Sequence, residues 1–297
     1  LLAPPAPCPS RRRAPPCGVA LAADAGDDGG EWIDGEDGLL DDVGLRVQVF
    51  DEEWELAEAL VELVREVAEE ALEMQDYFTL AIPGGSVAKA LGGLKDLDLD
   101  WSRVVLLFVN ERCPARKNLA LAKETFVDAV GIPEENVITV GDGTPSEEAT
   151  KYEQAIFDIK GMPRTTYEVP SVDLVLLGAG ADGHVGSIYP NSPCARLEVD
   201  ALVAGVEMPD KMSITFTLDL INAASVVCVA ATGANKSGMV LKALEADPED
   251  GGEESRLPVA LVSPDEGDLM WFLDQPAAKD AIEAGVMTET AEEDEEE

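Results

Sequence analysis

The sequence predicts an α/β protein built on a single doubly wound, mostly parallel β-sheet. Short apolar runs rich in Val, Ile and Leu alternate with longer segments of helical periodicity, which is the pattern of repeated βαβ units. The runs are continuous rather than interleaved with polar residues, which indicates strands buried on both faces. Turns rich in Gly and polar residues follow several of them. We therefore expect one Rossmann-like domain, over residues 44–282 of the 297.

The first predicted element is a helix over residues 51–74, where apolar side chains recur every three or four positions. A short strand follows at 78–82 and ends at Pro83. Further strands are predicted at residues 103–109, 136–140, 172–177, 225–230 and 258–262. Further helices are predicted at residues 119–130, 146–159 and 236–244.

The two ends differ from this domain in composition. Residues 1–23 contain no acidic residue, are rich in Pro and Ala and include three consecutive arginines. This composition is typical of a targeting segment or of an ordinary disordered tail, so we expect a protein of the chloroplast or the cytoplasm. An acidic, Gly-rich linker follows up to residue 43, and residues 283–297 are expected to be an acidic tail.

The formal net charge of -39 limits the possible partners. The acidic excess lies in the body as well as at both ends, so it repels nucleic acid and anionic lipid. An anionic metabolite can bind only where local basic residues compensate. No apolar run reaches the roughly 18 residues that span a bilayer. We expect a small-molecule partner, and a monomer or a weak homodimer.

Cysteine and histidine usage argues against a metal site. The five cysteines are odd in number and lack a C-x-x-C spacing, so neither a disulfide framework nor a zinc site is predicted. His184 is the only histidine, which excludes a site with two histidine ligands.

Two glycine- or charge-bearing turns follow the first strands. The turn Pro83-Gly84-Gly85-Ser86 lets the backbone approach a ligand, and N–H groups at a helix start attract phosphate, although a bare turn needs Gly too. The turn Asn110-Glu111-Arg112 offers a guanidinium whose planar fork suits a phosphate or carboxylate. The alternative is that Glu111 and Arg112 form an ordinary ion pair at the surface.

The segment Gly178-Ala179-Gly180-Ala181-Asp182-Gly183-His184 contains the spacing of a dinucleotide fingerprint. That interpretation fails, because Gly186, Pro190 and Pro193 interrupt the helix that the fingerprint must open. His184 beside Asp182 is instead a candidate general base, since a free imidazole titrates near pH 6.5. The alternative is that His184 is a structural or merely exposed histidine.

The fourth turn, Thr232-Gly233-Ala234-Asn235-Lys236, opens a predicted helix. A lysine at a helix start opposes the helix dipole unless an anion also binds there. Lys236 is therefore a candidate phosphate ligand.

Together these motifs resemble those of the 6-phosphogluconolactonases. They are residues 84–86 (GGS), 111–112 (ER), 173–184 (DLVLLGAGADGH), 214–217 (ITFT), 233–236 (GANK) and 257–260 (LPVA). The related glucosamine-6-phosphate deaminases carry Asn-Glu-Pro where this chain has Ile188-Tyr189-Pro190, so the resemblance favours the lactonases.

The resemblance implies hydrolysis of 6-phospho-D-glucono-1,5-lactone to 6-phosphogluconate, in the oxidative pentose phosphate pathway. It also implies that the reaction requires no metal or organic cofactor. His184 would deprotonate the attacking water, and Asp182 would hold the ring or the turn. Gly180 and Gly183 would form the turn or supply backbone N–H groups to the oxyanion. The phosphate would bind Arg112, Lys236 and the backbone of Gly84, Gly85 and Ser86.

The chain departs from the family pattern at two positions. Asn110 replaces the usual Asp, which the deaminases use as their proton-transfer base, and Ser213 replaces a common Arg. Lys211, two residues earlier, is a candidate to compensate for that Arg. Two alternatives to a lactonase therefore stay open: a deaminase-like isomerase, and a catalytically silent sugar-phosphate-binding protein.

Overall fold

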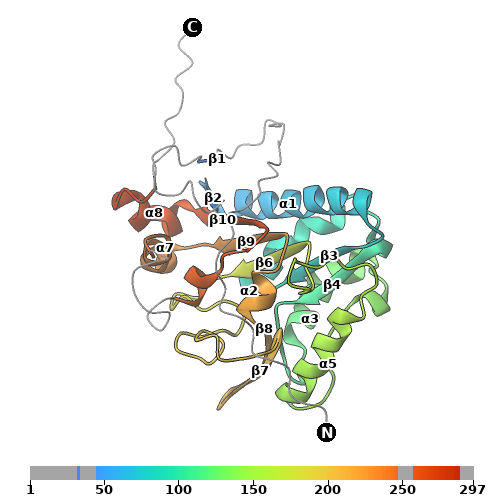
Figure 1. Ribbon diagram of the computed structural model, residues 1–297. Coiled ribbons are helices and arrows are strands. Elements are labelled where there is room, and N and C mark those ends of the chain that lie inside the picture. Colours follow the sequence, from blue (N-terminus) through green and yellow to red (C-terminus); the bar gives the residue numbers. More distant parts are fainter. Residues whose placement is uncertain (1–31, 34–44, 247–256, 288–297) are drawn as a thin grey trace.

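The computed structural model describes residues 32–33, 45–246 and 257–287 (Figure 1). The predicted targeting segment, most of the linker and the acidic tail beyond residue 287 lie outside these ranges. None of the helices in these ranges combines the length and the hydrophobicity that a membrane-spanning helix requires.

A seven-stranded sheet forms the centre of the fold, with the order β1-β2-β10-β9-β6-β3-β4. Every neighbouring pair is parallel except β1 and β2. All residues of β3, β4 and β9 are buried, as their continuous apolar runs predicted. The strands are β1 Trp32–Ile33, β2 Leu45–Phe50, β3 Phe78–Ile82, β4 Val104–Phe108, β6 Leu174–Gly178, β9 Val226–Ala231 and β10 Asp268–Asp274. This architecture confirms the predicted α/β class.

Helices cover both faces of the sheet, so the core has two layers (Figure 1). Leu80 packs in one layer with Leu60 of α1, and its neighbour Ala81 packs in the other with Met239 of α7 and Ala278 of α8. The α-helices are α1 Glu53–Met74, α2 Gly85–Ala90, α3 Lys117–Ala122, α4 Asp128–Val130, α5 Pro145–Phe157, α6 Leu218–Ile221, α7 Ser237–Leu244 and α8 Gln275–Glu283. A π-helical turn, η3 Lys123–Val127, joins α3 to α4. The 3-10 turns are η1 Leu91–Asp96, η2 Trp101–Arg103, η4 Glu134–Asn136, η5 Ala234–Lys236 and η7 Pro258–Leu261.

A second, antiparallel sheet of three strands was not predicted. It has the order β5-β8-β7, with β5 Asn110–Arg112, β8 Lys211–Phe216 and β7 Val203–Met208. β5 follows β4 almost directly, so this sheet begins where the carboxyl edge of the large sheet ends. It lies at the foot of the molecule in Figure 1, away from α1.

The prediction of a strand at residues 136–140 is wrong, because the Tyr152 side chain replaces the backbone hydrogen bonds that would pair this segment with β4. Only one bridge joins this segment to β4, between Val137 and Leu106. Next to it, the Tyr152 hydroxyl accepts a hydrogen bond from the Phe108 N–H at 2.7 Å and donates to the Ile138 carbonyl at 3.1 Å. The phenol of α5 therefore separates the two backbones.

The strand predicted at 258–262 is also wrong. Pro258 begins a 3-10 turn there, and the Val259 N–H donates outside the sheet, to the Gly183 carbonyl at 3.0 Å. The strands β2 and β10, which sequence analysis missed, pair with each other in parallel instead. After β10 the chain continues through α8 to Met287, which is buried, so packing extends past residue 282.

We predict that Tyr152→Phe destabilises the protein by about 1–3 kcal/mol, because the Phe108 N–H and the Ile138 carbonyl lose their buried partner. Urea denaturation measures the loss. Tyr167→Phe is the matched control, since Tyr167 is 61% exposed. Equal stability of the two variants would contradict the role given to the Tyr152 hydroxyl.

Candidate functional site

The order of the strands places the four predicted turns at one edge of the sheet. From β3 the chain moves to β4 on one side, and then to β6 on the other side of β3. This reversal is the topological switch point at which doubly wound sheets bind ligands. The four turns follow β3, β4, β6 and β9, which are parallel, so all four lie at the carboxyl edge.

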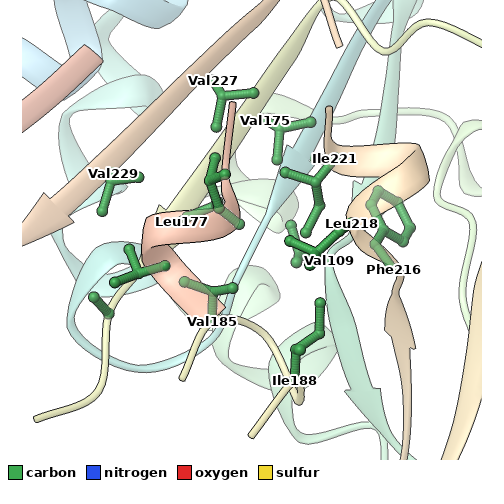
Figure 2. Close-up of a cluster of buried hydrophobic side chains, with 14 of the residues drawn as sticks. Val109, Val175, Leu177, Val185, Ile188, Phe216, Leu218, Ile221, Val227 and Val229 are labelled. Carbon is green, nitrogen blue, oxygen red and sulfur yellow. The ribbon is translucent and has the colours of Figure 1, made fainter. Parts of the chain in front are cut away.

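The turn after β6 is a closed, anchored loop. The Gly180 N–H donates to the His184 carbonyl at 2.8 Å, and the Gly183 N–H donates to the Gly180 carbonyl at 2.9 Å. Val185 and Ile188 then fix the loop to the core, where Figure 2 shows them within the buried cluster of Leu177 and Val109. The loop therefore holds its histidine on a rigid support.

His184 and Asp182 form a hydrogen-bonded pair at the surface of this loop. The Nδ1 atom of His184 lies 2.5 Å from Oδ1 of Asp182, and the side chains are 33% and 54% exposed. Burial raises the pKa of Asp182, but hydrogen bonds from the ring and the backbone N–H of His184 outweigh it and hold that pKa below its ordinary value. An ionised carboxylate only accepts hydrogen bonds, so Nδ1 carries a proton, and in the neutral imidazole Nε2 is the nitrogen with the free lone pair.

Two glycines of the loop leave no room for a side chain. A Cβ on Gly180 would lie 2.1 Å from Nδ1 of His184, and a Cβ on Gly183, where φ is +80°, would lie 2.7 Å from Cβ of Leu257. The N–H groups of both glycines donate within the loop. Gly180 and Gly183 therefore build the turn, and their N–H groups are not free to donate to an oxyanion.

Tyr189 and Lys211 join the histidine in a contact that sequence analysis did not predict. The Tyr189 ring lies with its centroid 4.9 Å from that of His184, at an interplanar angle of 35°. The Lys211 ammonium donates to the Tyr189 hydroxyl at 3.3 Å. In the sequence, Lys211 was singled out only for its charge, and nothing marked Tyr189 as its partner.

The turn after β4 divides its roles between two charged residues. Glu111 is fully buried, and its carboxylate accepts from the backbone N–H groups of Arg112 at 2.6 Å, Asn118 at 3.0 Å and Leu119 at 2.7 Å. It therefore caps the start of α3 and does not form an ion pair with Arg112. The half-buried Arg112 side chain has no carboxylate partner within the described part of the chain.

Asn110 and Ser213, the two departures from the family pattern, meet at one hydroxyl. The Asn110 amide and the Ser213 hydroxyl each donate to Oγ of Ser187, both at 3.1 Å. The Ser187 N–H donates in turn to Oγ1 of Thr215 at 3.0 Å. A neutral, buried hydrogen-bond network thus joins the small sheet to the histidine loop.

The remaining predicted residues lie at the other turns of this edge. Gly84 packs against the side chain of Asn118, Gly85 has φ of +73° and Ser86 is exposed. Lys236 ends η5, is half-buried and has no acidic partner among the described residues. A buried Asp274 carboxylate holds the start of that turn, because it accepts from the Gly233 N–H at 2.8 Å.

Known proteins match this chain over most of its length. A family described as glucosamine-6-phosphate isomerases/6-phosphogluconolactonase matches residues 51–271. A protein of Oryza sativa subsp. indica named probable 6-phosphogluconolactonase 2 is 34% identical, over 78% of this chain and 88% of that protein. Another from the same plant, probable 6-phosphogluconolactonase 3, chloroplastic, is 33% identical, over 77% of this chain and 74% of that protein.

A solved structure shares the fold. The crystal structure of 6-phosphogluconolactonase from Leishmania guyanensis superposes with a TM-score of 0.67, over 78% of this chain and 97% of that one. The two sequences are 23% identical, so this likeness concerns the fold alone.

We predict that Gly180→Ala displaces the His184 ring from Asp182, because the added methyl group occupies the position of Nδ1. NMR measures this directly, since a chain with one histidine gives one set of imidazole signals. The proton shared between Nδ1 and Asp182 should lose its downfield shift. Gly238→Ala is the control, because its Cβ would meet nothing closer than 3.7 Å. Unchanged ring signals in Gly180→Ala would contradict the prediction.

Proposed function

The chain belongs to the family of glucosamine-6-phosphate isomerases and 6-phosphogluconolactonases, and on that premise we propose that it hydrolyses 6-phospho-D-glucono-1,5-lactone to 6-phosphogluconate. The observation that carries this proposal is the hydrogen bond between Nδ1 of His184 and Asp182. In the neutral imidazole it makes Nε2 the basic nitrogen, on a loop at the ligand-binding edge of the sheet, and activation of a water molecule requires such a base.

In the proposed reaction, Nε2 of His184 removes a proton from water as the oxygen attacks the lactone carbonyl carbon. The carbonyl becomes a tetrahedral oxyanion, and its collapse breaks the bond to the ring oxygen. The imidazolium then returns its proton to that oxygen, which leaves as a hydroxyl group. Asp182 stabilises the imidazolium between the two transfers, because its carboxylate stays ionised.

The phosphate of the substrate needs local positive charge in so acidic a protein. We propose that Arg112 and Lys236 supply this charge, together with the backbone of Gly84, Gly85 and Ser86. Both cations lack an acidic partner within the described residues, and both follow strands at the carboxyl edge. A charged hydrogen bond of this kind contributes about 1.5–3 kcal/mol.

An isomerase mechanism receives less support from the side chains present. A carboxylate at position 110 would be needed to move a proton along the sugar, as in the related deaminases. Here the side chain is an amide, and it donates to Ser187. Hydrolysis uses the base that His184 provides and needs no carboxylate at position 110.

We also propose a plastid or cytoplasmic location, and a monomer or a weak homodimer. The composition of residues 1–23 supports the plastid, as does the relative named chloroplastic. Fusion of residues 1–23, with any upstream sequence, to a fluorescent reporter tests the location.

We predict that His184→Asn lowers kcat by about 10²–10⁴-fold and leaves the melting temperature within a few degrees of wild type, because only the base is lost. The assay is formation of 6-phosphogluconate from freshly made lactone, corrected for spontaneous hydrolysis. Wild-type kcat in this variant at neutral pH would refute the assignment.

The pH profile gives a second prediction on the same residue. The wild-type rate should fall as the pH drops from about 8 to 5, the range in which imidazoles gain a proton. Asp182 stays ionised in this range, since its pKa is lowered, so the acidic limb should fit the loss of one base. A flat profile over this range would argue against a histidine base.

We predict that Lys236→Ala and Arg112→Ala each raise KM for the phosphorylated lactone about tenfold or more, because each removes a charged hydrogen bond to the phosphate. Hydrolysis of unphosphorylated gluconolactone should change little. Lys242→Ala is the control, since Lys242 is exposed on α7. Equal losses on both lactones would assign these residues to the fold or to the chemistry instead.

A further inference from the structure

One face of β8 holds the histidine loop at regular intervals. Side chains two residues apart on a strand project from the same face, and Lys211, Ser213 and Thr215 have this spacing. Thr215 accepts from the backbone of Ser187, Ser213 donates to the Ser187 hydroxyl, and Lys211 donates to the Tyr189 hydroxyl. The strand therefore supplies three successive anchors to residues 187–189 of the loop.

Lys211 is the charged anchor of the three. Its ammonium donates to the Tyr189 hydroxyl and lies 5.3 Å from the centroid of the same ring, within the range of a cation–π contact. It is half-buried, and no acidic side chain pairs with it among the described residues. In a chain with 60 acidic residues, this cation is engaged by an aromatic ring rather than by a carboxylate.

The anchored ring reaches the base itself. Asp182 fixes the Nδ1 edge of the His184 imidazole, and Tyr189 lies against the ring. These contacts limit rotation of the imidazole about its bond to Cβ. Nε2 is left as the ring nitrogen that Asp182 does not engage.

We propose that Tyr189 and Lys211 are positioning residues that clamp the His184 imidazole with Nε2 in its reactive orientation. This inference deepens the proposed hydrolysis and rests on it. Lys211 acts through the hydroxyl of Tyr189, which locks the aromatic ring, and the ring in turn locks the imidazole. In this proposal the clamp acts on the imidazole and not on the substrate, so it affects every lactone that His184 hydrolyses.

The test is a double-mutant cycle of Lys211→Met and Tyr189→Phe, which break the same hydrogen bond and keep the aliphatic stem and the ring. Each variant should lower kcat about tenfold with KM unchanged, since a displacement of 1 Å can cost up to about 10²-fold in rate. The double variant should lose no more than either single one. The losses should be equal for phosphorylated and unphosphorylated gluconolactone, and Lys211→Arg should restore most of the rate.

NMR of the single histidine gives a readout that does not depend on activity. Both variants should shift the imidazole signals, because the ring of residue 189 moves relative to His184. Lys160→Met and Tyr167→Phe, at exposed positions, should leave them unchanged. If the wild-type protein hydrolyses neither lactone, the proposed function is wrong. The imidazole NMR signals of the variants still show in that case whether Lys211 and Tyr189 position His184.

Three outcomes would overturn the clamp. A Lys211→Met variant with raised KM for the phosphorylated lactone alone would make Lys211 a phosphate ligand. Independent losses that multiply in the double variant, or imidazole signals identical to wild type, would show that Lys211 and Tyr189 do not act on His184 together.

Discussion

The arrangement of this protein depends on one constraint: buried backbone N–H and C=O groups must find partners where the sheet ends. At the carboxyl edge, side chains provide these partners. Glu111 receives three N–H groups at the start of α3, and Asp274 receives those of Gly233 and Ala277. Tyr152 bridges β4 and the segment beside it. These polar residues are buried because the backbone needs them.

The same constraint separates the residues that serve the backbone from those that remain available to a ligand at this edge. The carboxylates of Glu111 and Asp274 accept hydrogen bonds from backbone N–H groups. The side chains of Arg112 and Lys236, by contrast, have no acidic partner in the described ranges. The His184 loop satisfies its own amides, including those of Gly180 and Gly183. Its imidazole can therefore be both rigidly held and chemically free.

Sequence alone predicted the elements whose information is local. The strand at 78–82 was predicted to the residue, and α1, α5 and α7 to within a few residues, because each has its own periodicity. The loop of His184 was recognisable from Gly and His at fixed spacing. The wrong predictions involve distant partners or mixed composition. Tyr152 prevents a strand in a segment that begins 16 residues earlier. The strand β10 was missed because its apolar residues lie between Asp268 and Asp274. The contact between Tyr189 and Lys211 spans two elements, so no local pattern could indicate it.

The hydroxyl of Tyr152 has a consequence for how molecules of this protein meet one another. β4 is the last strand of the large sheet, and an open strand edge is a template for pairing with another chain. Here the Leu106 carbonyl is occupied by the Ile138 N–H, and the Phe108 N–H by the phenol of α5. This edge therefore offers few free groups to a second sheet. The Tyr152 contact, which prevents residues 136–140 from forming a strand, therefore also reduces the tendency of this edge to pair with another chain.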